Sequence, residues 1–360
     1  MWAGYSLSGL LDARAEPTLP KRTPAEVADW AASPHPQPRS GFLELNTNLG
    51  LGDFSTAGGG GSSGSFGLAA GSNTGRLWED GAQRRIALLR PLEETDWYRI
   101  GDATYVWHSA DVRATKVPTP NVQTTPSGLI TSLASGGTIE SPDGMAARFL
   151  ALRDQSTRLV LHAPTYVAGR ASYQLGLIPQ TPTSLITEVA VGVDAATGLP
   201  LSVTVHTRSG TVAIESKFTS ITFKRPGATN FKFTTPREAK LTDSTQVSRT
   251  PDYSGDWRRE HQRAEALADV QSVSGIDQAL VKLATTGQGW DETVALSGFN
   301  WWRLDRLGNV AKPVSGPYGS GRLLETPAFS LLILDGGRIV AGAVTPEGLI
   351  STATQIAGTR

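Results

Sequence analysis

The sequence of 360 residues contains no cysteine, which excludes a disulfide, a thiolate metal site and a lipidated cysteine. Its five histidines are scattered one by one, without the spacing of a zinc or non-haem iron site, so no metal and no cofactor is expected. A P-loop lysine and a serine in a strand-turn-helix elbow are also missing. These absences favour a protein that binds over one that catalyses, and they leave the cellular compartment open.

Charge of one sign is not in excess, since 33 Lys and Arg balance 33 Asp and Glu. A chain without net charge has no excess of positive charge to bind phosphate backbones, so nucleic acid is not an expected partner. No apolar stretch approaches the roughly 20 residues that span a bilayer. For the apolar start at residues 1–11, two alternatives stay open: a chain cut just after a membrane anchor, or an ordinary segment packed on the body.

The composition is typical of a folded, loop-rich β protein. Hydrophobic residues make up 39% and charged residues 18% of the chain, which also has 39 Gly and 22 Pro. Because domains commonly hold roughly 100–200 residues, two units are expected.

A block of short alternating segments at 41–233 is the dominant pattern. Leu43 and Leu45 alternate with Glu44 and Asn46, as in a strand with one buried face. Similar segments follow in quick succession, joined by short turns such as Glu79-Asp80-Gly81 that force antiparallel neighbours. The block therefore predicts a large curved sheet whose apolar face is wider than two short helices can cover.

Two helices are predicted beside this sheet. The string Thr23-Pro24-Ala25-Glu26 combines a capping box with a proline in the first turn, and the helix runs through Trp30. Ser141-Pro142 caps the second helix, whose apolar stripe suits a position across a sheet. The stripe consists of Met145, Phe149, Leu150 and Leu152.

The Gly/Ser-rich residues 56–73 predict a loop, in which GxGxxG and GxSxG occur without the flanking strand and helix that give them meaning. Residues 118–126 are interpreted as a linker, and the polar residues 241–274 as a linker or surface helix.

The remaining pattern predicts a small α+β unit. Its elements are a helix over 275–286, strands over 294–296, 322–324, 329–334 and 338–344, and a final helix from Thr345-Pro346-Glu347.

An apolar face left uncovered predicts a cavity for a lipid or an acyl chain. Its candidate lining residues are apolar or aromatic side chains on the alternating strands, for which plain core packing is the alternative. They are Leu45, Trp78, Leu88, Trp97, Tyr105, Trp107, Tyr173, Leu175, Val191, Val203 and Phe218.

Glu93, Glu94 and Asp96 form the densest acidic cluster before a strand. Paired carboxylates perform general acid and base catalysis, so a hydrolase that uses these three residues is the enzyme alternative. Acidic side chains in a turn between exposed strands are usually only solvated, and no enzyme activity is expected.

Several spaced strings, in the right order, resemble the LolA-like family of actinobacterial envelope proteins. They are Asn48-Leu49-Gly50-Leu51, residues 76–89, Glu94-Thr95-Asp96, Thr104-Tyr105-Val106-Trp107, residues 167–175, residues 194–201 and Phe218-Thr219-Ser220-Ile221. The resemblance covers about residues 23–243. It implies an incomplete antiparallel barrel whose concave face, lidded by helices, holds acyl chains.

Two of these strings also resemble the N-terminal domain of RseB/MucB-type regulators, which share that fold: Ala168-Gly169-Arg170 with Tyr173, and Asp194 with Thr197-Gly198-Leu199-Pro200-Leu201. Residues 276–360 are similar to the smaller C-terminal domain of those regulators. A second domain departs from the minimal LolA carrier, and the lipobox cysteine of a lipoprotein is absent.

The predicted fold class is mainly β with α, a LolA-like incomplete antiparallel β-barrel with a helical lid plus a smaller C-terminal α+β domain. The predicted division is an N-terminal segment at 1–22, the half-barrel at 23–243, a linker at 244–275 and the small domain at 276–360. The expected function is an extracytoplasmic carrier or binding protein for lipids or lipoprotein acyl chains in the cell envelope. The alternative is an RseB/MucB-like envelope sensor that regulates an anti-sigma factor or similar membrane protein.

Overall fold

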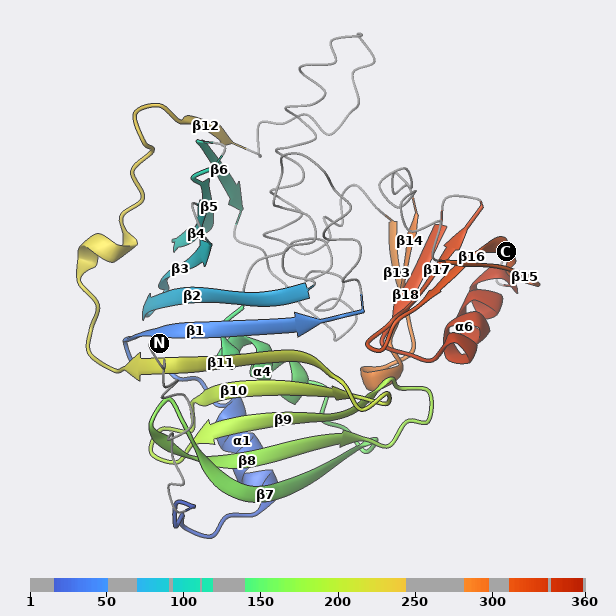
Figure 1. Cartoon of the computed structure of the whole chain (residues 1–360), viewed down its shortest axis with the longest axis horizontal. Coiled ribbons are helices and arrows are strands. Elements are labelled where there is room, and N and C mark those ends of the chain that lie inside the picture. Colours follow the sequence, from blue (N-terminus) through green and yellow to red (C-terminus); the bar gives the residue numbers. More distant parts are fainter. Residues whose placement is uncertain are drawn as a thin grey trace, which may run out of the picture.

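A curved twelve-stranded sheet carries most of the chain, and a six-stranded sheet follows it (Figure 1). The structure, a computed structural model, describes residues 16–50, 70–90, 93–110, 112–118, 140–243, 282–297, 311–335 and 338–358. The large sheet does not close into a barrel, since its strand order runs from an edge at β12 to an edge at β7. The predicted fold class is confirmed: an incomplete, mainly antiparallel half-barrel with helices, followed by a smaller α+β part.

The large sheet has the order β12-β6-β5-β4-β3-β2-β1-β11-β10-β9-β8-β7, in which only β12 and β6 are parallel. We call β2 to β6 the first limb and β7 to β11 the second limb, with β1 between them. The strands are β1 (Arg39–Asn48), β2 (Ala70–Asp80), β3 (Gln83–Arg90), β4 (Glu93–Ile100), β5 (Ala103–His108), β6 (Arg113–Pro118), β7 (Thr157–Val167), β8 (Arg170–Pro179), β9 (Ile186–Asp194), β10 (Pro200–Thr207), β11 (Val212–Thr222) and β12 (Lys240–Asp243).

Each limb is a meander of antiparallel hairpins, and two-residue turns join β2 to β3, β4 to β5 and β7 to β8. In the first limb, Gly81 and Gly101 occupy these turns with φ values of 61° and 64°, a left-handed conformation that glycine adopts without steric cost. The two limbs meet where β1 pairs with β11, across more than 160 residues of chain.

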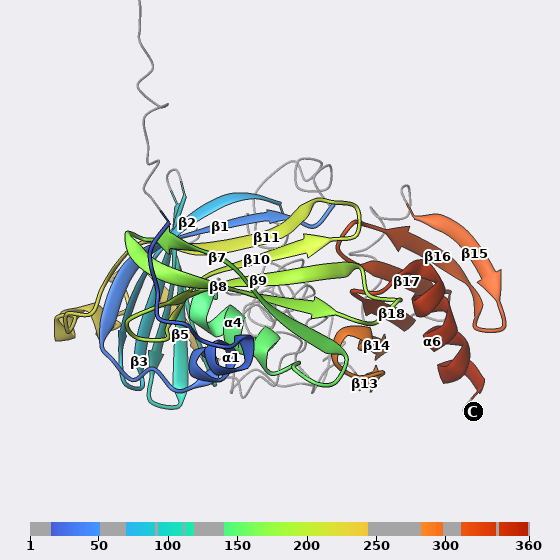
Figure 2. The same ribbon diagram turned by 90° about the horizontal axis from the view of Figure 1, so that it is seen from below.

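Two helices lie over the inner, concave face of the second limb (Figure 2). Helix α1 (Pro24–Ala32) begins with the predicted capping box of Thr23 and Glu26 and packs against β7 and β8. Helix α4 (Pro142–Leu150) packs mainly against β10 and buries Met145 and Phe149. As predicted, Ser141 is the N-cap residue of α4 and Pro142 lies in its first turn, but the Ser141 hydroxyl makes no capping hydrogen bond, and its oxygen instead accepts one from Arg84.

Three predicted boundaries are also wrong. Residues 241–243 were expected in a linker or surface helix, but they belong to β12, which pairs with β6. Residues 282–286 were expected in a helix, but they form β13 (Lys282–Thr286), which pairs with β14 (Thr293–Ser297); this long-range pairing overrides local helix propensity. Residues 70–73 were expected in a loop, but they begin β2, where they pair with β1. The predictions for residues 1–11, 56–69, 119–126 and 244–281 lie outside the described residues.

The second sheet has the order β13-β14-β18-β17-β16-β15 and is antiparallel throughout. Helix α6 (Pro346–Gly358) packs against β17 and β18, where its Leu349 and Ala353 join Leu332 and Val340 in a small core. The other strands are β15 (Lys312–Gly316), β16 (Gly319–Glu325), β17 (Ser330–Leu334) and β18 (Arg338–Gly342). All described strands of the two sheets lie in 39–243 and 282–342, while the domain boundaries themselves stay a prediction.

Trp290 joins the second sheet to the half-barrel. It lies in the short 3-10 helix η3 (Gly289–Asp291), and its ring stacks on Phe149 of α4 with a centroid distance of 6.1 Å. Its Nε1 donates a 2.8 Å hydrogen bond to Thr157 Oγ1 of β7. A second contact is an isolated β-bridge between Ser184 and Val344, so the two sheets share both apolar and backbone contacts.

Replacing Trp290 with alanine should lower the free energy of unfolding by about 3–5 kcal/mol, because it removes a fully buried aromatic side chain from this joint. Trp290→Phe is the matched control, because it keeps a ring against Phe149 but loses the hydrogen bond to Thr157. It should lower the free energy of unfolding by only about 1 kcal/mol. Urea unfolding measures both variants, and equal losses would contradict the packing role of the ring.

Candidate ligand-binding face

The inner face of the first limb is built from cross-strand rows of side chains. One row joins Gly41, Leu77, Ile86, Trp97 and Val106 from β1 to β5, because each of these residues lies directly opposite the next. The last four belong to the same buried cluster. The row is therefore a continuous apolar band across five strands.

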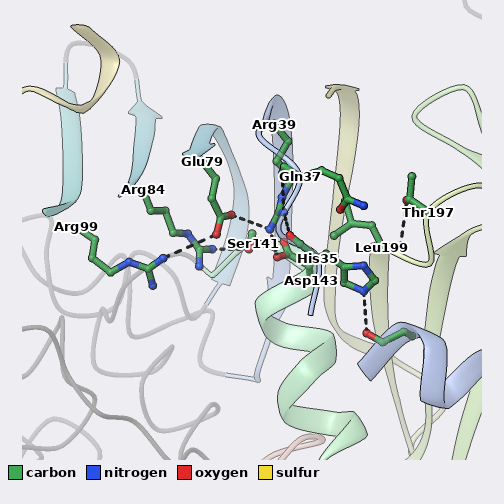
Figure 3. A network of polar contacts seen from close by, with 11 residues as sticks. His35, Gln37, Arg39, Glu79, Arg84, Arg99, Ser141, Asp143, Thr197 and Leu199 are labelled. Carbon is green, nitrogen blue, oxygen red and sulfur yellow. Dashed lines mark hydrogen bonds and ion pairs between the residues drawn. The ribbon is translucent and has the colours of Figure 1, made fainter. Parts of the chain in front are cut away.

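A polar row lies at the end of this band, where the same strands begin or end. It runs Arg39, Glu79, Arg84 and Arg99 across β1, β2, β3 and β4, again in direct register (Figure 3). Three arginines thus accompany one glutamate. The inner face changes from charged to apolar within two residues along each strand.

Arg39 ties this polar row to α4. Its side chain is only 4% exposed, and its Nη2 lies 2.7 Å from both Glu79 Oε2 and Asp143 Oδ2 (Figure 3). Its Nη1 donates to the His35 carbonyl oxygen at 2.9 Å. Burial raises the pKa of Asp143, but the guanidinium groups of Arg39 and Arg84 outweigh burial and hold that pKa below its usual range. The first turn of α4 is therefore fixed to β1 and β2 by ionised groups.

Arg84 and Arg99 are less fully paired than Arg39. Arg84 Nη2 donates to the neutral hydroxyl of Ser141 at 2.5 Å, and Arg99 Nη2 lies 3.8 Å from Glu79 Oε1. Burial and the neighbouring Arg84 guanidinium hold the pKa of Arg99 below its usual range. The arrangement places two cations side by side at the end of the apolar band.

Trp97 contributes a polar atom to the band itself. Its side chain is 6% exposed, and its buried Nε1–H has no acceptor among the described residues. A buried donor without an acceptor costs about 1–3 kcal/mol, so it is an unusual feature of an otherwise apolar surface.

Eight of the predicted lining residues lie together on the inner face. On the second limb their neighbours are α1 and α4, which contribute Val27, Ala28, Met145 and Phe149 to the same cluster, so these side chains pack as core. The eight are Leu45, Leu88, Trp97, Tyr173, Leu175, Val191, Val203 and Phe218. Only Leu88 and Trp97 belong to the first limb, and the lipid-binding role of all eight stays a prediction.

The other three predicted residues, Trp78, Tyr105 and Trp107, are directed to the outer face, so their assignment to the inner face is wrong. Each is one residue away from an inner-face neighbour such as Leu77 or Val106, and the period of two turns it outward. The outer face also buries aromatic rings there, because residues 223–239 cross it between β11 and β12 (Figure 1).

This crossing segment covers the outer face with two phenylalanines. Phe231, at the end of the short 3-10 helix η1 (Ala228–Phe231), packs with Trp78 and Ala87. Phe233 stacks on Tyr105 at 5.0 Å and meets Tyr98 at 5.4 Å. A hollow of about 220 Å³ remains between the segment and the sheet, lined by Asp96, Tyr98, Trp107, Lys232, Phe233, Thr234 and Pro236.

Two of the three acidic residues of the enzyme alternative meet Arg85 on this outer face. Arg85 Nε donates to Asp96 Oδ1 at 2.9 Å, and Arg85 Nη2 lies 3.3 Å from Glu94 Oε1. Burial raises the pKa of Asp96 to about 6 in spite of the Arg85 pair, and burial with Asp96 nearby raises that of Tyr98 to about 12. Glu93 instead faces Arg90, at 4.0 Å. Each carboxylate thus has an arginine partner, an arrangement that holds strands together.

A second hollow, of about 290 Å³, is lined mainly by polar residues of β1, β10 and β11, among them Asn46, Thr204 and Glu215. Both hollows lie on the outer face and are smaller than the roughly 300–1,000 Å³ of common ligand pockets. Within the described ranges, no three His, Asp or Glu side chains are grouped to hold a metal ion. No helix in that part of the chain is long and apolar enough to cross a membrane.

Comparison with known proteins finds similar solved structures. No family model matches the chain, and no curated protein does. The similar structures include the Pseudomonas aeruginosa MucA/MucB complex, at 14% identity over 91% of this chain and 97% of the other, with a TM-score of 0.44. They also include a LolA superfamily protein from Nitrosomonas europaea, at 9% identity over 59% of this chain and 99% of the other, with a TM-score of 0.25.

A putative outer membrane lipoprotein-sorting protein domain from Vibrio parahaemolyticus is a further similar structure, at 14% identity over 57% of this chain and 95% of the other, with a TM-score of 0.25. Both families that the sequence strings resemble, LolA-like and RseB/MucB-like, therefore recur among the similar structures. At such identities and TM-scores the likeness carries no argument about function, which has to come from the geometry of the chain itself.

The buried carboxyl of Asp96 makes stability depend on pH. Between its ordinary value of 3.8 and about 6, folded Asp96 keeps a proton that the unfolded chain releases. The contribution of Asp96 to the free energy of unfolding should therefore fall as pH rises through this interval. Asp96→Asn removes the titrating group and serves as reference in urea unfolding at a series of pH values. A stability difference between the two proteins that stays flat or rises with pH would contradict the assignment.

Proposed function

We propose that this chain is an extracytoplasmic binding protein for lipids or lipoprotein acyl chains, and that the ligand lies on the inner face of the first limb. The observation that carries the proposal is the position of the described helices. Helices α1 and α4 pack over β7, β8, β10 and β11 of the second limb (Figure 2). The apolar band of Leu77, Ile86, Trp97 and Val106 lies on the first limb.

The physical basis of binding is burial of apolar surface. Each methylene of an acyl chain transferred from water to such a band contributes about 0.8 kcal/mol, and the band extends across five strands. The band is itself buried, since Val106 is 0% exposed, and Leu88 on the same face is 3% exposed. An acyl chain therefore has to displace part of the existing cover, so binding requires an opening motion as well as contact.

Leu88 and Leu89 offer a matched pair of substitutions, because they are adjacent in β3 and face opposite sides. Leu88 is 3% exposed on the inner face, whereas Leu89 is 40% exposed on the outer face. Leu88→Gln should weaken uptake of a fluorescent fatty acid by about tenfold, since one buried apolar side chain is worth roughly 1.5–3 kcal/mol. Leu89→Gln should leave uptake unchanged.

Circular dichroism and thermal melts establish that both variants are folded at the assay temperature. Native mass spectrometry of the gently purified protein supplies a second readout, in which co-purifying lipid is expected. Equal uptake by the two variants, or no bound lipid and no uptake by the parent protein, would contradict the proposal.

A second candidate function is an envelope sensor of the RseB/MucB kind, whose ligand changes how the chain engages a membrane-bound regulator. It is favoured by one observation: Phe149, on the helix that covers the inner face, stacks directly on Trp290 beside the second sheet. A ligand that moves α4 would act on the second sheet through this stack.

Hydrogen exchange separates a sensor from a simple carrier. The amide of Leu185 donates to the Ala343 carbonyl oxygen at 2.8 Å, and that of Thr345 to the Thr183 carbonyl oxygen at 2.7 Å, so both report on the joint between the sheets. A sensor should show faster exchange at these two amides when oleate is added. The amide of Val191, inside the core of the second limb, is the internal control. Unchanged exchange at the joint would exclude this mode of sensing.

A further inference from the structure

We propose that the ends of β3 and β4 form a subsite for the anionic head of an acyl ligand, in which Arg84 and Arg99 bind the anionic oxygens and Trp97 donates a hydrogen bond to the next polar atom. The inference rests on the proposed function and names the ligand class: an amphiphile with a negatively charged head. Its head would lie on the polar row, which Figure 3 shows, and its tail on the apolar band.

The charges of the polar row are unbalanced. Arg39, Arg84 and Arg99 share the row with the carboxylates of Glu79 and Asp143, and Arg39 lies 2.7 Å from both of them. The buried carboxyl of Glu140 also acts on Arg84, but it is itself paired with Arg148 at 2.6 Å, so this pair adds no net charge to the row. The described groups therefore leave one positive charge in excess, and it falls on Arg84 and Arg99.

The register of β3 and β4 makes this excess positive charge unfavourable. Arg84 and Arg99 lie directly opposite each other on β3 and β4, and like charges in that position destabilise a sheet. Arg84 has a neutral hydroxyl as its partner, and its buried Nε has none among the described residues. A bound anion that accepts from both guanidinium groups would remove the repulsion, and arginine pairs well with carboxylate and phosphate oxygens.

The subsite is accessible at its charged end and buried at its apolar end. The Arg99 side chain is 34% exposed, while Trp97, two residues along the same face of β4, is 6% exposed. Trp97, whose indole Nε1–H has no acceptor in the described part of the chain, lies in the register between the pair Arg84–Arg99 and the pair Leu88–Thr95. An ester oxygen next to a head group is an acceptor of suitable chemistry for it.

Two heads fit this chemistry, the carboxylate of a fatty acid and the phosphate of a phospholipid, since both present oxygens that two guanidinium groups bind. Three probes distinguish these sources from a site that binds tails alone: oleate, dioleoyl phosphatidylglycerol in detergent, and the uncharged monoolein. Affinities are measured by displacement of a fluorescent fatty acid from the full chain.

The double variant Arg84→Gln/Arg99→Gln should bind at least one anionic probe about tenfold or more weakly, because charge-assisted hydrogen bonds contribute about 1.5–3 kcal/mol each. Its affinity for monoolein should change by less than about twofold, since apolar burial is retained. Arg225→Gln, which removes a 73% exposed arginine of the outer face, is the matched control and should bind all three probes as the parent protein does.

Trp97→Phe keeps the ring and removes the donor. It should weaken binding of the two ester-bearing probes, phosphatidylglycerol and monoolein, by about threefold to tenfold, the effect of one lost hydrogen bond, and leave oleate, which has no ester, unchanged. Its melting temperature should stay at or above that of the parent protein. In the arginine variant, equal losses for monoolein and the anionic probes, or no loss for either anionic probe, would overturn the head subsite while leaving tail binding intact. A parent protein that binds none of the three probes would instead overturn the proposed function itself.

Discussion

The two-residue period of a β-strand is the constraint on which this structure depends. It divides every strand of the large sheet into an inner and an outer set of side chains, and direct register then aligns these sets into rows across neighbouring strands. The apolar band and the polar row of the first limb are consequences of that alignment. So is the aromatic cluster on the outer face, which requires its own cover by Phe231 and Phe233.

Much of the fold could be predicted because its signals are local. The capping box of Thr23 and Glu26, the alternation of Leu43 with Glu44 and the glycine turns each depend on a few adjacent residues. Predictions failed where distant partners decide the structure. Residues 282–286 form a strand because β14 pairs with them, and the hydroxyl of Ser141 is engaged by Arg84 from another part of the chain.

The site was less predictable than the fold for the same reason. Trp78, Tyr105 and Trp107 carry no local mark of the face they occupy, since the crossing segment 223–239 makes the outer face apolar as well. The pair of Arg84 and Arg99 was not found, because fifteen residues separate the two and only the hairpin register brings them opposite each other. Equal counting outward from Arg90 and Glu93, which face each other in the β3–β4 hairpin, would have provided the signal.

The strand order has a further consequence for how the chain reaches its native state. Within each limb nearly every pairing is between consecutive strands, so both meanders can form from contacts of short loop length. The β1–β11 pairing, by contrast, closes a loop of more than 160 residues, and the parallel β6–β12 pairing can follow only when the segment after β11 has crossed the outer face. Chain entropy favours an order in which each meander forms first and the β1–β11 pairing forms slowly afterwards. This pairing therefore sets the rate at which the whole half-barrel is completed.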